Sequence, residues 1–196
     1  MKIVIVTFLV ISPYLIRNYV HFNQIFLVKS FGYNLWKGNN QLSKVEGYGK
    51  ISEFKNIHDK VKSISKDKYY EINWDNIFLG EAINNIEKNS VKYLKLFFKK
   101  LFSFYFIDPE STYPNYYNFL HIFPIIIISL LSFPSLIVFF RNNKFENKYL
   151  GLYLFFNLVI FSVFFILPRY KLVILPVQII LVGYTLTYLI KKIGKS

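Results

Sequence analysis

Long, uninterrupted apolar runs constrain this chain more than any other feature of its sequence. Residues 119–140, 149–167 and 172–190 contain no Asp, Glu, Lys or Arg. Each run has about the 20 residues that a helix needs to cross the hydrocarbon core of a bilayer. Helices of soluble cores are rarely so long and so uniformly apolar. Together with a shorter apolar run at residues 3–16, they predict an all-α polytopic membrane protein with about four transmembrane helices.

The composition excludes several other classes of protein. Hydrophobic residues make up 54% of the 196 residues, which rules out an intrinsically disordered chain. The net charge of +13 suggests a nucleic-acid binder, but such a soluble domain would distribute its apolar residues in short periodic runs. We therefore expect membrane lipid and no nucleic acid as a partner. The absence of cysteine excludes disulfides, thiolate chemistry and Cys-ligated metals.

The first apolar run has two interpretations. Residues 1–16 are short for a transmembrane helix and resemble the apolar region of a signal peptide. However, Ser12-Pro13-Tyr14 is not a small-x-small cleavage site, and a single Lys precedes the run. The sequence therefore favours a membrane anchor, transmembrane helix 1, over a cleaved signal.

The cations near the span ends predict the orientation of the chain. Positive residues in short connections favour the cytoplasmic side of the membrane. With spans at 1–16, 119–140, 149–167 and 172–190, seven such cations fall on one side, and residues 191–196 form a cytoplasmic tail. They are Lys2, Arg141, Lys144, Lys148, Lys191, Lys192 and Lys195. Residues 17–118 then form a large, mostly helical extracytoplasmic loop.

Within this loop, the pattern changes from irregular to helical. Glycines punctuate the stretch up to about residue 75, whereas residues 74–106 show helical periodicity, with Asn89-Ser90 as a cap for a second helix. One face of that helix is apolar, with Val91, Leu94, Phe98, Leu101 and Tyr105. The other is basic, with Lys92, Lys95, Lys99 and Lys100. This pattern predicts an amphipathic interfacial helix; an amphipathic helix packed on its own protein is the alternative, and the two are compatible.

Three cations contradict the rule for charge placement. Arg169 and Lys171 lie in a very short turn on the outer side, and Arg17 follows the first span. Arginine donates paired hydrogen bonds to phosphate oxygens, and lysine adds a mobile point charge. We expect these side chains to bind a lipid phosphate; the alternative is that they are snorkelling anchors at helix ends.

Other candidate groups carry less information. His21, His58 and His121 are far apart and have no accompanying carboxylate cluster, so no metal site is expected. Four acids on the outer side could act as a base, although isolated carboxylates in a Lys-rich loop are usually solvated. They are Asp75, Glu81, Asp108 and Glu110. The sequence contains no glycine-rich phosphate loop or nucleophile elbow.

Several motifs, in order along the chain, resemble a known pattern. They are Pro13-Tyr14-Leu15-Ile16-Arg17-Asn18-Tyr19, Gly32-Tyr33-Asn34-Leu35-Trp36, Gly38-Asn39-Asn40, Glu81-Ala82-Ile83 with the Lys92–Lys100 helix, and Pro168-Arg169-Tyr170-Lys171-Leu172 with Pro176. The pattern is that of bacterial members of the dolichyl-phosphate-mannose protein mannosyltransferase superfamily, which are glycosyltransferase family 39-like enzymes of the GT-C fold. Tyr14 replaces the usual Trp, Lys171 the second Arg, and Val173 the first Pro of the last motif.

The resemblance implies a membrane glycosyltransferase that moves a sugar from a polyprenyl-phosphate donor to an acceptor hydroxyl on lipid, glycan or protein. It implies donor-binding roles for Arg17, Arg169, Lys171 and Tyr170, and a loop motif of Asn18, Gly38, Asn39 and Asn40. It also implies the bacterial inner (cytoplasmic) membrane, with no metal or cofactor.

The family's catalytic carboxylate belongs to an outer loop upstream of everything matched here. We therefore expect this chain to correspond to the C-terminal half, with no catalytic residue of its own, and to be inactive without an N-terminal half, which could be a separate chain. The alternative is a small non-enzymatic membrane subunit or lipid-binding partner of an envelope complex. A transporter is disfavoured because only Asn157 and Gln178 are polar near mid-span.

Overall fold

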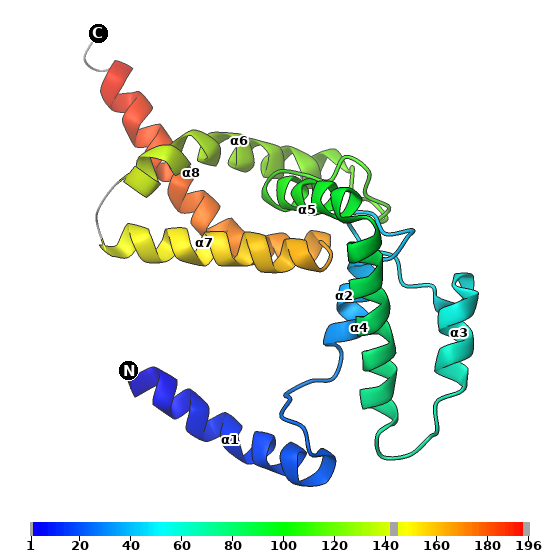
Figure 1. Cartoon of the computed structure of the whole chain (residues 1–196). Helices are drawn as coiled ribbons and strands as arrows, with labels where there is room; N and C mark the ends of the chain where they lie inside the picture. The colour runs from blue at the N-terminus through cyan, green and yellow to red at the C-terminus, as the bar shows by residue number, and fades with distance from the viewer. Residues whose placement is uncertain (1, 142–144, 194–196) are drawn as a thin grey trace.

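The computed structural model describes residues 2–141 and 145–193, with side chains for 3–136 and 148–191. The prediction of an all-helical protein is confirmed for these residues, which contain no β-strand (Figure 1). The helices are α1 (Lys2–Phe22), α2 (Phe31–Asn39), α3 (Lys55–Lys62), α4 (Tyr70–Lys88), α5 (Ser90–Tyr105), α6 (Phe119–Arg141), α7 (Phe145–Val163) and α8 (Lys171–Ile193). Two short 3₁₀ turns are η1 (Ile51–Glu53) and η2 (Pro168–Tyr170).

Three helices in the described part are long and apolar enough to cross a membrane. These segments are Ile3–Phe22, Phe119–Leu136 and Pro168–Lys191. The first extends beyond the predicted end at residue 16, because α1 continues through Arg17 to Phe22. The protein is therefore a helical protein with membrane-spanning candidates, and a fourth span stays a prediction.

The predicted span at 149–167 corresponds to the shorter helix α7. Its helical geometry ends at Val163, and the apolar helical stretch covers only Lys148–Val163. Leu167 is extended because it precedes Pro168, and a residue before proline disfavours helical geometry. The Ile166 N–H also donates to the Val45 carbonyl at 2.9 Å, which holds this non-helical segment against the loop.

The helices α5, α6, α7 and α8 share one apolar core. Its buried members are Val45, Phe104, Tyr105, Leu154, Ile166, Ile174, Val177 and Leu181. The end of α5 packs into this core through Phe104 and Tyr105. The Tyr105 hydroxyl and the Ser132 hydroxyl of α6 lie 2.8 Å apart. Helix α5 is thus joined directly to the long apolar helices.

A second core holds α2, α3 and α4 together as an outer unit. Leu35, Trp36, Ile57, Phe78 and Ala82 are its buried residues. Helices α2 and α4 approach closely at Gly32, where an added Cβ would lie 2.1 Å from the Asp75 carbonyl oxygen. The Asp75 carboxylate accepts the Tyr33 N–H at 2.9 Å in the first turn of α2, where a negative charge is favourable.

The ends of the long helices define two sides of the molecule. In Figure 1 the start of α1, the start of α7 and the end of α8 lie on one side, and the outer unit lies on the other. This arrangement agrees with the predicted topology, whereas the assignment of the sides to cytoplasm and exterior stays a prediction. Lys144 and Lys195 lie outside the described residues, as do the side chains of Lys2, Arg141 and Lys192.

Candidate functional site

A buried lysine joins the outer unit to the end of α7. Lys100 is completely buried, which corrects its predicted place on the basic face of the interfacial helix. Its ammonium donates to the carbonyl oxygens of Gly38 at 2.8 Å and Phe164 at 2.6 Å. These carbonyls lie at the C-terminal ends of α2 and α7, where helix dipoles are negative, so the cation stabilises both ends. Burial lowers the pKa of Lys100 to about 7.

The Gly38-Asn39-Asn40 motif forms the other half of this junction. An added Cβ at Gly38 would lie 1.7 Å from the Phe164 carbonyl oxygen, so only glycine fits. The Asn39 amide donates to the carbonyls of Leu35 at 2.9 Å and Val163 at 2.8 Å. The Asn40 amide donates to the Tyr48 carbonyl at 2.6 Å. These three residues connect the loop to α7 through their backbone fit and hydrogen bonds.

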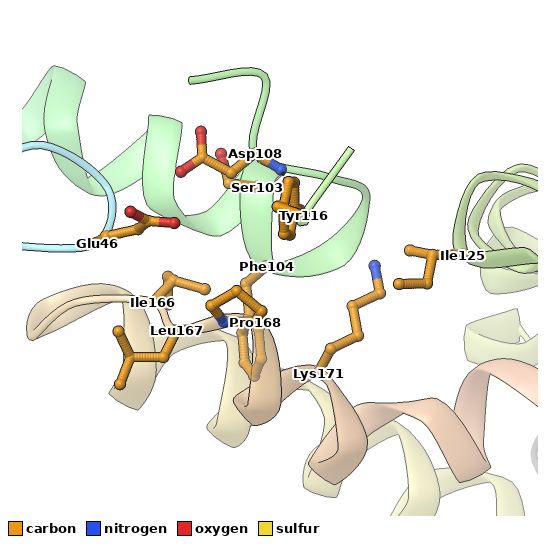
Figure 2. Close-up of a pocket in the computed structure, with 10 residues that line it drawn as sticks. All are labelled: Glu46, Ser103, Phe104, Asp108, Tyr116, Ile125, Ile166, Leu167, Pro168 and Lys171. Atoms are coloured by element: carbon orange, nitrogen blue, oxygen red, sulfur yellow. Dashed lines mark hydrogen bonds between the residues drawn. The ribbon is translucent and has the colours of Figure 1, made fainter. Parts of the chain in front are cut away.

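Lys171 has a similar inward position at the start of α8. It is buried, and its ammonium donates to the carbonyls of Tyr105 and Phe106 and to the Ser129 hydroxyl at 3.1 Å. Figure 2 shows its Nζ pointing toward Ile125 of α6. The side chain therefore binds the C-terminal end of α5, and its predicted contact with a lipid phosphate has no support in this geometry. Tertiary packing, which the local motif does not encode, sets this orientation.

The other predicted donor-binding residues lie on two separate elements. Arg169 of η2 is exposed, with its guanidinium 5.7 Å from the Tyr170 ring centroid. Arg17 of α1 is also exposed and donates to the Asn18 side-chain oxygen at 3.2 Å. Figure 1 shows α1 lying apart from α8. The structure therefore does not bring the three predicted cations together in one clamp.

Asn18 and Tyr170 have internal contacts. The Asn18 amide donates to the Phe26 carbonyl at 2.7 Å, which folds the segment after α1 back on the helix. The Tyr170 ring packs on Phe161, with ring centroids 4.9 Å apart. The Arg169 guanidinium thus lies on an aromatic side chain that α7 fixes in place.

Two cavities have Glu46 and Asp108 as common lining residues. The first has a volume of about 20 Å³, which is enough for a single water molecule. It is lined by Glu46, Ser103, Phe104, Asp108, Tyr116, Ile125, Ile166, Leu167, Pro168 and Lys171 (Figure 2). It is too small for a sugar.

The second cavity is large enough for a small polar ligand. Its volume is about 390 Å³, within the range of ligand pockets. It is lined by Leu42, Lys44, Val45, Glu46, Gly47, Tyr48, Glu53, Asp108, Glu110 and Thr112. The loop of residues 42–48 thus meets the segment that follows α5.

Asp108 differs from the other acids of this cavity. It is buried, and burial is the main cause that raises the pKa of its carboxyl. One oxygen, Oδ1, accepts the Glu110 N–H at 3.0 Å. No donor in the described part of the chain reaches Oδ2. A buried carboxyl with a raised pKa beside a polar cavity is suited to proton transfer.

The neighbouring acids are already engaged. Glu46 accepts hydrogen bonds from the Ser111 hydroxyl and from Thr112, whose N–H lies at 3.0 Å and whose hydroxyl lies at 2.6 Å. Glu110 forms an ion pair of 2.7 Å with Lys99, which lowers the pKa of its carboxyl. Of the other predicted acids, Asp75 caps α2, and Glu81 lies on α4 away from this cavity.

The histidines do not gather into a site. The Nδ1 atom of His121 lies 2.9 Å from the Tyr116 carbonyl oxygen, and the two rings contact each other edge to face. Among the described residues, no group of three or more His, Asp or Glu side chains could hold a metal ion.

Sequence reasoning missed Glu46 and the role of Lys100. Glu46 lies in a glycine-rich loop with no periodic signal, and its partners Ser111 and Thr112 lie 65 and 66 positions away. The periodicity of α5 places Lys100 with the other lysines, because periodicity carries no information about distant helix ends. Asp108 could be identified as a candidate acid, since it lies just beyond the predicted helix at residues 74–106.

No protein-family model, curated protein or solved structure matches the chain. The resemblance to glycosyltransferase family 39-like enzymes therefore depends on the motifs and their positions alone, and it stays a prediction.

Proposed function

We propose that this chain is a component of a GT-C-type membrane glycosyltransferase that transfers a sugar from a polyprenyl-phosphate donor to an acceptor hydroxyl on a lipid, glycan or protein. One observation carries the proposal. Pro168, which directly precedes Arg169, lines the smaller cavity together with Asp108, and Asp108 also lines the larger cavity. A candidate base and a candidate phosphate ligand thus come from segments about 60 positions apart along the chain.

The two residues would have complementary roles. Asp108 would accept the proton of the acceptor hydroxyl as its oxygen bonds to the anomeric carbon of the sugar. The bond from that carbon to the phosphate oxygen breaks at the same time, and polyprenyl phosphate leaves. The Arg169 guanidinium would counter the charge that develops on the leaving phosphate. This role for Asp108 departs from the expectation from the resemblance, which assigns the base to an upstream loop and leaves this chain inactive alone. With Asp108 as the base, the chain would turn over the donor by itself.

Donor turnover in membranes tests the proposal. Membranes from cells that express the full chain would be given a panel of radiolabelled polyprenyl-phosphate sugars, and loss of the donor would be measured. We expect Asp108→Asn to slow turnover about 100-fold or more, the usual contribution of a general base. Glu110→Gln is the matched control, because Glu110 lines the same cavity but its carboxylate is exposed and ion-paired with Lys99. We expect this control to retain activity.

Donor binding is measured separately on purified protein. Arg169→Ala is expected to weaken binding of undecaprenyl phosphate about tenfold, since it removes a charge-assisted contact. Membrane insertion should not change. If the wild-type chain turns over none of the donors, or if Asp108→Asn and Glu110→Gln have equal effects on turnover, the assignment is wrong.

A non-enzymatic membrane subunit is the second candidate, and a specific observation favours it. Asn39, Lys100 and Lys171 all use their hydrogen bonds on carbonyls at helix ends, which is a structural role. Such a protein would show no donor turnover. The Asp108→Asn gene would then complement a deletion strain as fully as the wild-type gene does.

A further inference from the structure

A groove between α6 and α8 lies toward the end of the molecule remote from the outer unit. Its volume is about 710 Å³, and its lining includes Pro134 of α6 and Ile180, Gly183, Tyr188 and Lys191 of α8. Figure 1 shows that α8 crosses α6 and projects beyond it toward the C-terminus. The groove therefore belongs to the membrane-spanning part and is separate from the cavities near Asp108.

Two sequence features create the groove. A proline within a helix removes a backbone hydrogen bond and bends the helix, and Pro134 lies inside α6. Opposite it, Gly183 contributes no side chain, and an added Cβ there would meet no atom within 4 Å. The two helices therefore leave space between them at this level.

Hydrogen bonds at the floor keep the two helices together. The Ser135 and Thr185 hydroxyl oxygens lie 2.6 Å apart, and the Thr185 hydroxyl donates to the Leu131 carbonyl at 2.6 Å. Both side chains are buried. The groove thus has a fixed floor.

The lining of the groove matches an amphiphile with an anionic head. Its walls are mainly apolar, Ile180 is 41% exposed and Tyr188 is 65% exposed. Lys191 supplies a cation at the end of the helix, and none of the described residues that line the groove is acidic. Tyrosine and lysine are the side chains that meet lipid headgroups at a membrane interface. The charge and shape therefore favour a lipid with a phosphate head and an acyl tail.

We propose that this groove binds one anionic phospholipid of the bilayer. An acyl chain lies against Pro134, Ile180 and Gly183, and the phosphate lies at Lys191. The site is independent of the proposed sugar donor, which would bind at the opposite end of α8.

Native mass spectrometry of the purified full chain tests the site. Protein in detergent would be mixed with equal amounts of phosphatidylglycerol and phosphatidylcholine, and the retained lipid measured. We expect the wild type to retain one phosphatidylglycerol in preference to phosphatidylcholine. Gly183→Leu fills the groove, and we expect it to lower this retention about tenfold. The added side chain has open space and improves helix propensity, so the variant should fold.

Two further variants make the result specific. Gly80→Leu in α4 is the matched control, because a Cβ at Gly80 also meets nothing within 4 Å, and it should retain lipid as the wild type does. Lys191→Gln should abolish the preference for phosphatidylglycerol. Because Lys191 is exposed, the substitution should leave the fold intact.

Three results would overturn the proposal. They are equal retention of the two lipids by the wild type, unchanged retention in Gly183→Leu, and displacement of phosphatidylglycerol from this groove by undecaprenyl phosphate. Because Arg169→Ala does not alter the groove, loss of donor binding in that variant and loss of phospholipid in Gly183→Leu can be told apart.

Discussion

Lys100 and Lys171 are buried lysines whose ammonium groups bind main-chain carbonyls at helix ends. Lys100 reaches the ends of α2 and α7, and Lys171 reaches the end of α5. The last carbonyls of a helix have no partner within the helix and carry partial negative charge. One ammonium group has three donors and can therefore serve several of these carbonyls. In this protein, two lysines satisfy carbonyls that a glycine cap satisfies in many other helices.

The first prediction concerns Lys100 and pH. Its pKa is about 7 in the folded protein, against an unfolded value of about 10.4. Between these values the unfolded chain binds more protons, so this group makes stability rise with pH from about 7 to 10 and leaves it level below 7. Lys100→Met removes the part of the pH dependence that Lys100 contributes and, at neutral pH, lowers stability by about 2 kcal/mol because buried carbonyls lose their donor.

Thermal unfolding in detergent between pH 6 and 10 measures both effects. Lys95→Met is the control, because Lys95 is exposed on the same helix, and it should retain the wild-type pH profile. A parallel pH profile for wild type and Lys100→Met would contradict the assignment of the titration to Lys100.

At the scale of elements, the sequence predicts interiors of helices better than their ends. The apolar runs at 119–140 and 172–190 correspond to α6 and α8, and the predicted Asn89 cap is confirmed by its 3.2 Å bond from the Lys92 N–H. The sequence predicts that the apolar helix at 149–167 ends at Leu167, whereas α7 ends at Val163. The helix ends earlier because the Phe164 and Ile166 backbone groups bond to distant partners. Hydropathy reports the solvent around a residue, whereas these ends are set by tertiary hydrogen bonds.

The candidate site shows the same division. The turn with Arg169 could be identified because its charge contradicts its place in the sequence. The larger cavity could not, since Glu46 and Asp108 lie on segments that only the tertiary fold brings together. Local patterns give no distance between segments that are so far apart along the chain.

The second prediction concerns helix α5 as an interfacial element. Its exposed apolar side chains are Val91, Leu94, Phe98 and Phe102. The chain has no cysteine, so single-cysteine variants can carry a nitroxide without background. Spin labels at Leu94 and Phe98 should be accessible to oxygen and protected from a water-soluble nickel complex, because they face acyl chains. A label at Lys88 should show the reverse, and equal nickel access at all three positions would refute the interfacial placement.

At the scale of the whole molecule, the two cores lie at opposite sides of one junction. The aromatic core of the outer unit and the core of α5 to α8 meet where Lys100, Gly38 and Phe164 contact each other. Helix α1 stands apart from both and is exposed along most of its length (Figure 1). Lipid or other membrane helices are the surroundings that suit such an apolar surface.

The third prediction concerns the orientation of the whole chain. The distribution of cations predicts that the outer unit is extracytoplasmic. A cysteine at Lys66 should react with a membrane-impermeant maleimide in intact cells. A cysteine at Lys148 should react only after the cells are permeabilised. Labelling of position 148 in intact cells would reverse the topology.

The junction at Lys100 also has a consequence for biogenesis. Its bond to the Phe164 carbonyl joins residues 64 positions apart, and the segment that contains Lys100 leaves the ribosome first. Until α7 has been made, this ammonium lacks its acceptor at the end of that helix, and Gly38 lacks the surface against which it packs. The outer unit therefore cannot complete its attachment during its own synthesis. It can dock fully only after α7 has been made and lies beside it.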